Sequence, residues 1–268
     1  MNKHRLVHRG LLVCALLLLA ACGGGSKNSG AGSDATVGGL WTGTLTVNGI
    51  AYDAQAMSSE SGELELLETD PTSSFQAQYW GMISASGEQL SASFSGAVLN
   101  QADPYSDGSL RGTGTASGTI HQRSSISATV SFTTALGTAV PGQLSLTYDP
   151  AYEQASSLAT IAGNFTNTAS PGTDVLSIDA AGLLSYTDPL TTQCTATGTL
   201  TVLDSRYAVY AAQMSFSTCT GAYTVLNGVS IQGLASLDVN RNPKPLRFMM
   251  HGMENGQDSP VFLSYQGT

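Results

Sequence analysis

Histidine and carboxylate side chains are the residues of this chain best suited to acid–base or metal chemistry. Only two histidines follow residue 22, His121 and His251, and neither has a second ligand candidate at a spacing typical of zinc sites. We expect both to be surface or core residues. Acidic residues gather in one stretch, Glu60, Glu63, Glu65, Glu68 and Asp70. This stretch favours a solvated edge strand protected by charge, with a site for a cation or a basic partner as the alternative.

Two stretches resemble calcium-binding loops in part, at Asp103–Gly108 and Asp238–Pro243. The first lacks the closing glutamate, and the second has Pro243 where such a loop needs glycine, so we predict turns. The sequence contains no Gly-x-Ser-x-Gly and no Ser-x-x-Lys motif. We therefore expect no enzyme, no metal and no other cofactor. A hydrolase built on two carboxylates that face one cleft remains the alternative.

The amino terminus has the features of an export signal. Lys3, Arg5 and Arg9 precede the apolar run Leu11–Leu19, which is shorter than the about 20 residues that span a bilayer. The run closes on Leu19-Ala20-Ala21-Cys22. This arrangement resembles the signal peptide and lipobox of bacterial lipoproteins, and a plain secretory signal is the alternative.

The lipoprotein resemblance implies a chemical role for Cys22. In that family the thiol receives a diacylglyceryl group, the chain is cut before the cysteine, and the new amine is acylated, for example by palmitate. Gly23 follows in place of aspartate, which favours the outer membrane of a Gram-negative bacterium. The chain also resembles the Ser-, Thr- and Gly-rich lipoproteins of Gram-negative bacteria, a likeness that implies no activity.

The charge of the exported chain narrows its partners. Without the signal, seven Lys and Arg stand against 19 Asp and Glu, a net charge of −12. This balance argues against nucleic acid or an anionic lipid surface as a partner, because both need basic patches. Solubility is the simpler role of the charge. The basic cluster Arg241, Lys244 and Arg247 is predicted to be a charged loop, with a phosphate or an acidic partner as the alternative.

Two cysteines remain after export, Cys194 and Cys219. An even pair in an oxidising compartment predicts a disulfide, and free or redox-active thiols are the alternative. Closure of a loop of this length would stabilise the fold by about 3 kcal/mol.

Alternation of apolar and polar residues predicts an all-β, antiparallel fold. Leu40–Val47 shows the pattern first, and turn pairs such as Asn48-Gly49 separate the candidate strands. The other candidate strands are Phe75–Ile83, Leu90–Val98, Ser125–Phe132, Gln143–Tyr148, Val175–Ile178, Ala196–Leu203, Tyr207–Phe216, Ile231–Val239, Leu246–His251 and Val261–Tyr265.

The chain divides into four parts. We expect the signal at residues 1–21, lipidated Cys22 with a flexible Gly/Ser tether at 22–38, a first β-domain at 39–150 and a second, with the disulfide, at 158–268. Loose echoes between the halves favour duplication. Each half holds about eight candidate strands, which predicts two up-and-down, eight-stranded barrel-like units. One larger barrel or a sandwich is the alternative.

Gly39 and Trp41 open the first expected strand, and this Gly-x-Trp pattern resembles that of the lipocalins, or calycins. The resemblance implies that the Trp closes one barrel end beneath a basic residue near the last strand. The first half departs from the pattern, because it has no Arg or Lys after Arg123; the second half has Phe165, with Arg247 as a possible partner. An ordinary core aromatic is the alternative for Trp41.

These observations predict a lipid-anchored envelope lipoprotein that acts as a non-catalytic binding or scaffolding module. Its expected partners are the membrane, through Cys22, and either an apolar ligand in a barrel or an envelope protein. A role in envelope assembly or surface interaction is the alternative.

Overall fold

The computed structural model describes residues 34–70, 75–99, 104–167, 174–188, 193–254 and 257–267. The predicted signal peptide, Cys22 and most of the tether lie outside the described residues. Within this part of the chain, no helix is long and apolar enough to cross a membrane.

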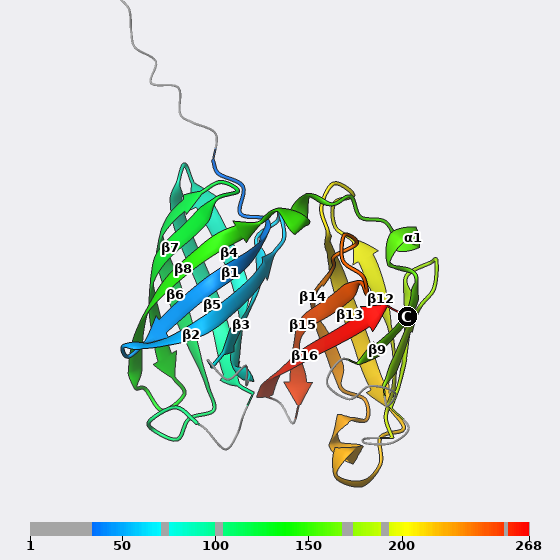
Figure 1. Cartoon of the computed structure of the whole chain (residues 1–268). Coiled ribbons are helices and arrows are strands. Elements are labelled where there is room, and N and C mark those ends of the chain that lie inside the picture. Colours follow the sequence, from blue (N-terminus) through cyan, green and yellow to red (C-terminus); the bar gives the residue numbers. More distant parts are fainter. Residues whose placement is uncertain are drawn as a thin grey trace, which may run out of the picture. The chain divides into compact units, whose positions relative to one another are not determined.

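The chain folds into two closed, antiparallel, eight-stranded barrels, as the alternation predicts (Figure 1). The first barrel consists of β1 (Gly39–Val47), β2 (Ile50–Ser58), β3 (Glu63–Thr69), β4 (Phe75–Ser86), β5 (Gln89–Val98), β6 (Arg111–His121), β7 (Ser125–Thr134) and β8 (Ala139–Asp149). The second consists of β9 (Gly163–Asn167), β10 (Val175–Ile178), β11 (Leu183–Thr187), β12 (Thr195–Val202), β13 (Val209–Ser217), β14 (Ser230–Leu237), β15 (Pro245–Glu254) and β16 (Gln257–Gly267). Two short helices, η1 (Pro150–Glu153) and α1 (Leu158–Ile161), join the barrels, and η2 (Gly221–Leu226) lies between β13 and β14.

Each barrel is an up-and-down meander that closes on itself. In the first, every strand pairs with its neighbour along the chain, and β1 closes the ring by pairing with β8 from Leu40↔Asp149 to Val47↔Gly142. In the second, β16 and β10 flank β9. The tight β1–β2 turn depends on Asn48 and Gly49, which both have positive φ. Closure leaves neither barrel with an open edge.

The acidic stretch is one place where the sequence prediction is wrong. Three of its residues, Glu63, Glu65 and Glu68, lie on β3, which pairs with β2 and β4 and is therefore no edge strand. Glu65 is 2% exposed and Glu68 is 5% exposed. Glu68 faces the interior of the first barrel with Leu64 and Leu66, whereas Glu65 faces the outside, which the second barrel covers.

Besides the apolar core inside each barrel, a third apolar cluster lies where the barrels contact each other. Its buried members come from both barrels and from the connection between them: Met57, Leu67, Tyr152, Val209, Leu234 and Met249. On the connection, the Tyr152 ring stacks on that of Tyr207 at 4.6 Å between centroids. β3 is consequently buried on both faces. One face packs inside the first barrel, and the other packs in the apolar cluster between the barrels.

Candidate functional site

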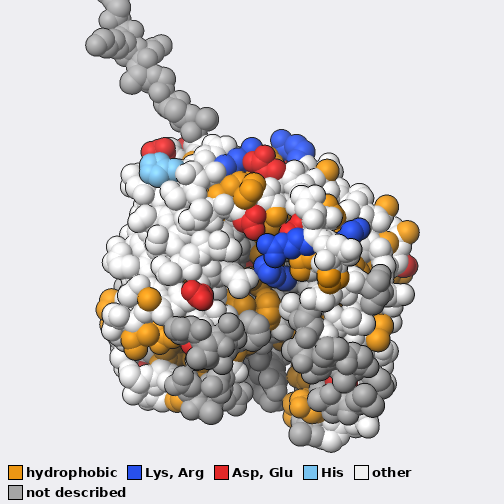
Figure 2. Space-filling model, viewed as in Figure 1, with side chains coloured by type: hydrophobic (Ala, Val, Ile, Leu, Met, Phe, Trp, Pro, Cys, Tyr) orange, Lys and Arg blue, Asp and Glu red, His pale blue; other side chains and the backbone are white. Residues whose placement is uncertain are grey.

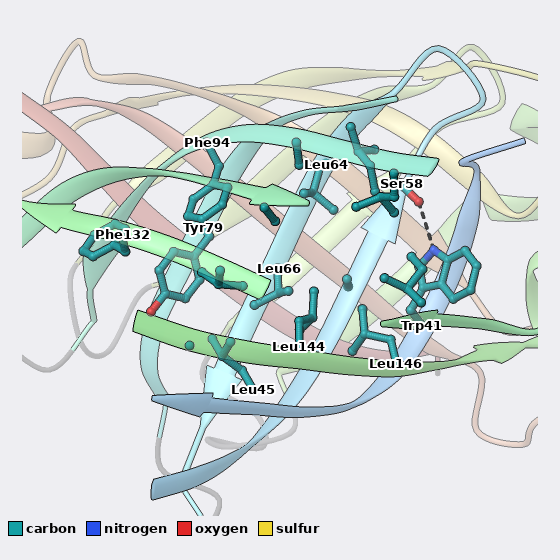
Figure 3. Close-up of a pocket in the computed structure, with 18 of the residues that line it drawn as sticks. Trp41, Leu45, Ser58, Leu64, Leu66, Tyr79, Phe94, Phe132, Leu144 and Leu146 are labelled. Atoms are coloured by element: carbon teal, nitrogen blue, oxygen red, sulfur yellow. Dashed lines mark hydrogen bonds between the residues drawn. The ribbon is translucent and has the colours of Figure 1, made fainter. Parts of the chain in front are cut away.

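The interior of the first barrel contains a cavity of about 50 Å³ with an almost entirely apolar lining (Figure 3). Trp41 and Ser58 lie at one end, which we call the Trp41 end. Tyr79, Phe94 and Phe132 lie toward the other, which we call the Glu68 end. The lining also includes Leu64, Leu66, Ile83, Leu90, Ile126, Val130, Leu144 and Leu146. An eight-stranded barrel is wide enough for one small ligand when its own side chains do not fill it.

The cavity exists because several inward positions carry small residues. Ala56, Ala92, Ala116 and Gly142 all line it. Such positions leave space that a leucine or phenylalanine would occupy. A cavity of about 50 Å³ has room for a few water-sized groups.

Glycines make room for the aromatic rings of the Glu68 end. A Cβ on Gly96 would lie 2.4 Å from the Tyr79 ring, and one on Gly112 would lie 2.6 Å from the Phe132 ring. The Tyr79 ring meets those of Phe94 and Phe132 edge-on, each at 5.7 Å. These rings form one wall of the cavity, and any side chain at either glycine would displace it.

The Trp41 end is closed and its polar atoms are satisfied. Trp41 Nε1 donates to Ser58 Oγ at 3.0 Å, and Ser58 Oγ donates to the Val37 carbonyl at 2.6 Å. The Trp41 ring meets Tyr148 edge-on at 5.3 Å, and Val37 is itself part of the core. Trp41 is 2% exposed, a core aromatic at one end of the barrel.

The Glu68 end holds a buried carboxyl group. Tyr79 Oη donates to Glu68 Oε2 at 2.7 Å. Burial raises the pKa of Glu68 to about 7, and the Tyr79 hydrogen bond offsets part of that rise. The Tyr105 ring packs against Phe132 at 5.2 Å. Its hydroxyl is buried beside the pair and close to Tyr79, but it makes no hydrogen bond of good geometry to any described residue.

A bonded turn holds Tyr105 over this end. Thr134 Oγ1 donates to Asp107 Oδ2 at 2.5 Å, and the Ser109 amide donates to Asp107 Oδ1 at 2.8 Å. These hydrogen bonds, the Thr134 bond above all, hold the pKa of Asp107 well below its usual range. The stretch that resembles a calcium loop is thus a turn around Asp107, while Asp103 lies outside the described residues.

A second polar site lies between the barrels. Glu65 Oε1 is 2.8 Å from His251 Nδ1, and Glu65 Oε2 accepts from Gln78 Nε2 at 3.0 Å. Gln78 Nε2 also donates to the Met250 carbonyl at 2.8 Å, and the Trp80 ring stacks on His251 at 5.1 Å. Burial raises the pKa of Glu65 to about 7, against the opposing effect of His251. This network joins β3 and β4 to β15.

A groove of about 420 Å³ runs beside that network, lined by residues of both barrels. Glu63 and Glu65 both line it, so two carboxylates share one cleft, as the hydrolase alternative requires. However, Glu65 is 2% exposed and both of its oxygens are bonded to protein groups. It is positioned to join the barrels rather than to meet a substrate.

The structure places the other predicted residues apart from either site. The Cys194–Cys219 disulfide is present, as predicted, in the second barrel. His121 pairs with Glu88 at an exposed position, at 3.2 Å. Cys22 lies outside the described residues.

The basic cluster begins in the turn before β15, which holds Arg241 and Lys244, and ends on β15, which holds Arg247. Arg241 pairs with Asp238 at 3.2 Å, and Arg247 points away from the barrel interior because Leu246 and Phe248 on either side point inward. Figure 2 shows a face on which backbone and side chains that are neither hydrophobic nor charged predominate, and charged side chains form a few small groups.

The sequence reasoning missed Glu68 with Tyr79 and the network around Glu65. The signal that was available is the spacing of Leu64, Leu66 and Glu68, which alternation places on one face. Among the described residues, no group of three or more His, Cys, Asp or Glu side chains could hold a metal ion. No protein-family model matches the chain, and no curated protein matches it either.

Proposed function

We propose that the chain is a lipid-anchored envelope protein that binds a small apolar ligand inside its first barrel, without catalysis. The observation that carries the proposal is the apolar cavity between Trp41 and Tyr79. Burial of each methylene group there would contribute about 0.8 kcal/mol. The lining is almost entirely apolar, which suits the binding of an apolar group.

The binding test uses Trp41 as the reporter. The chain has two tryptophans, so a Trp80→Phe variant leaves Trp41 as the only one. A brominated alkyl probe that enters the cavity should quench Trp41 emission in a saturable way. In the same background Ala116→Leu, which fills the cavity, should abolish quenching. Ser117→Leu adds a similar side chain to the exposed outer face of the same strand and should not. Equal quenching in the two variants would contradict the proposal.

The anchor is tested separately. Cys22→Ser should release the protein from the membrane fraction, because the acyl chains would no longer be attached. Cys14→Ser is the matched control, since Cys14 lies within the predicted signal and should be removed with it. Unchanged membrane association of the Cys22→Ser protein would refute the lipid anchor. Density-gradient separation of the wild type should place it in the outer membrane.

The groove between the barrels favours one second candidate, a surface-interaction protein. Exposed Met82 and Met253 lie beside cavities that Trp80 and His251 line. Photo-crosslinking from position 82 in cells should then recover one defined partner, with position 183 as the control. The same partner from both positions, or abundance-weighted proteins only, would count against it.

A further inference from the structure

The strongest unassigned feature is the position of Glu68 relative to the cavity. Glu68 is the next inward residue after Leu66, which lines the cavity, and it pairs across the sheet with Ala54 and Ala77. The carboxyl therefore lies next to one end of the apolar cavity, beside the hydroxyl of Tyr79; Tyr79 lines the cavity and Glu68 does not. Among the described residues only Oε2 is engaged, by Tyr79.

The two ends of the cavity differ in their capacity for a further polar group. At the Trp41 end, Ser58 Oγ already accepts from Trp41 and donates to Val37. At the other end, Glu68 retains acceptor capacity, and the buried Tyr105 hydroxyl lies close to Tyr79 without a hydrogen bond of good geometry to any described residue. An unsatisfied buried polar group costs free energy that a ligand group could recover. A ligand with one polar end would therefore be oriented, with that end at Glu68.

We infer that the ligand is an alkyl or similarly apolar molecule whose polar head donates hydrogen bonds, an amine or a hydroxyl group, and that Glu68 receives this head. The inference rests on the proposed function. An ammonium head would pair with the Glu68 carboxylate and a hydroxyl would donate to it, with the Tyr105 hydroxyl as a second contact. A carboxylate head would bring two like charges together in a site of low polarity.

The titration of Glu68 gives the amine a distinct pH dependence. The titratable groups that interact with Glu68 among the described residues are Tyr79 and Tyr105, and burial raises the pKa of both. Neither tyrosine loses its proton near neutral pH, so Glu68 is the group that ionises there. Its pKa of about 7 means that the site gains negative charge across neutral pH. Amine affinity should rise with pH in this window, carboxylate affinity should fall, and alcohol affinity should change little.

The experiment compares butylamine, butanol and butyrate, whose length matches the cavity, as competitors of the brominated probe in the Trp80→Phe protein, from about pH 5.5 to about pH 8.5. At the upper pH, butylamine and butanol should each bind about tenfold more tightly than butyrate. Butyrate binding as tight as that of the other two would overturn the inference while leaving the proposed function intact. Failure of all three to bind would overturn both.

Glu68→Gln is the diagnostic variant, and Glu65→Gln is the matched control. Both residues are buried on β3, but Glu65 faces the second barrel. Glu68→Gln should remove the preference for the amine and its pH dependence, whereas Glu65→Gln should preserve both. Loss of preference in both variants, or in neither, would overturn the inference. Should Glu68→Gln fail to fold, the opposite pH trends of butylamine and butyrate in the otherwise unchanged protein decide the matter.

Discussion

The two barrels share a topology but differ in what occupies their interiors. Large side chains occupy the second: Phe165, Leu176, Tyr186, Tyr210, Met214, Phe248, Met250 and Tyr265 belong to one buried cluster. In the first, alanine and glycine take many inward positions and a cavity remains. Strand number therefore permits a cavity, and side-chain volume decides whether one forms. Within one chain, the first barrel is suited to a ligand and the second to stability.

The largest expected effect comes from truncating the packed interior. Phe248 is fully buried and meets Tyr265 edge-on at 6.1 Å, so Phe248→Ala should cost about 3–5 kcal/mol. Phe132→Ala in the first barrel should cost less, because one side of that ring borders the cavity and has fewer contacts to lose. Urea unfolding followed by circular dichroism measures both. Equal costs would contradict the difference in packing.

The carboxyls of β3 should make the stability of the first barrel depend on pH. Burial raises the pKa of Glu65 and Glu68 from 4.5 to about 7 in the folded chain. The folded state then binds more protons than the unfolded state between these values, so each group lowers stability as pH rises from about 4.5 to about 7, by up to about 3 kcal/mol.

Glu68→Gln should remove the contribution of that residue, so its advantage over wild type should grow from about pH 5 to about pH 8. Tryptophan emission is the measurement, because Trp41 and Trp80 both lie in the first barrel. An advantage that stays constant over this range would show that Glu68 does not titrate there.

The disulfide should stabilise the second barrel alone. Replacing Cys194 and Cys219 by serine opens a loop with a sequence separation of 25, which should cost about 3 kcal/mol. The unfolding transition seen by tryptophan emission should move less than the transition seen by circular dichroism. Coincident shifts would mean that the barrels unfold as one cooperative unit, through the contacts of Glu65, Gln78 and His251.

The alternation of apolar and polar residues predicted the strands well wherever one face of a strand is exposed to solvent. β7 is the clearest case, since buried and exposed residues alternate along most of Ser125–Thr134. The pattern failed on β3 because the second barrel covers the outer face, which buries Glu65, and because Glu68 faces the interior of the first barrel. The strand pairing of β3 with β2 and β4 could not be read from its own residues.

The cavity was beyond sequence analysis for a different reason. Its size depends on which small residues of eight strands face one another, and that requires the register. Ala56, for example, lies opposite Trp41 on one side and Leu66 on the other. The contact between Glu68 and Tyr79 also depends on the register, because β3 and β4 bring the two residues together across the sheet at a diagonal position. The disulfide could be predicted without knowledge of the strand register, since only Cys194 and Cys219 remain once Cys14 is removed with the predicted signal and Cys22 is lipidated.

The smallest expected effect on stability tests the comparison of the two barrels most directly, because the same change, alanine to leucine, is made inside each barrel. Ala212 and Ala116 are both buried and inward-facing. Ala212→Leu should overpack the second barrel and cost about 1–3 kcal/mol, whereas Ala116→Leu should enter the cavity and change stability by no more than about 0.5 kcal/mol. Urea midpoints from circular dichroism measure both. If Ala116→Leu were as costly as Ala212→Leu, the space in the first barrel would not admit a side chain, and an alkyl ligand would have no room there either.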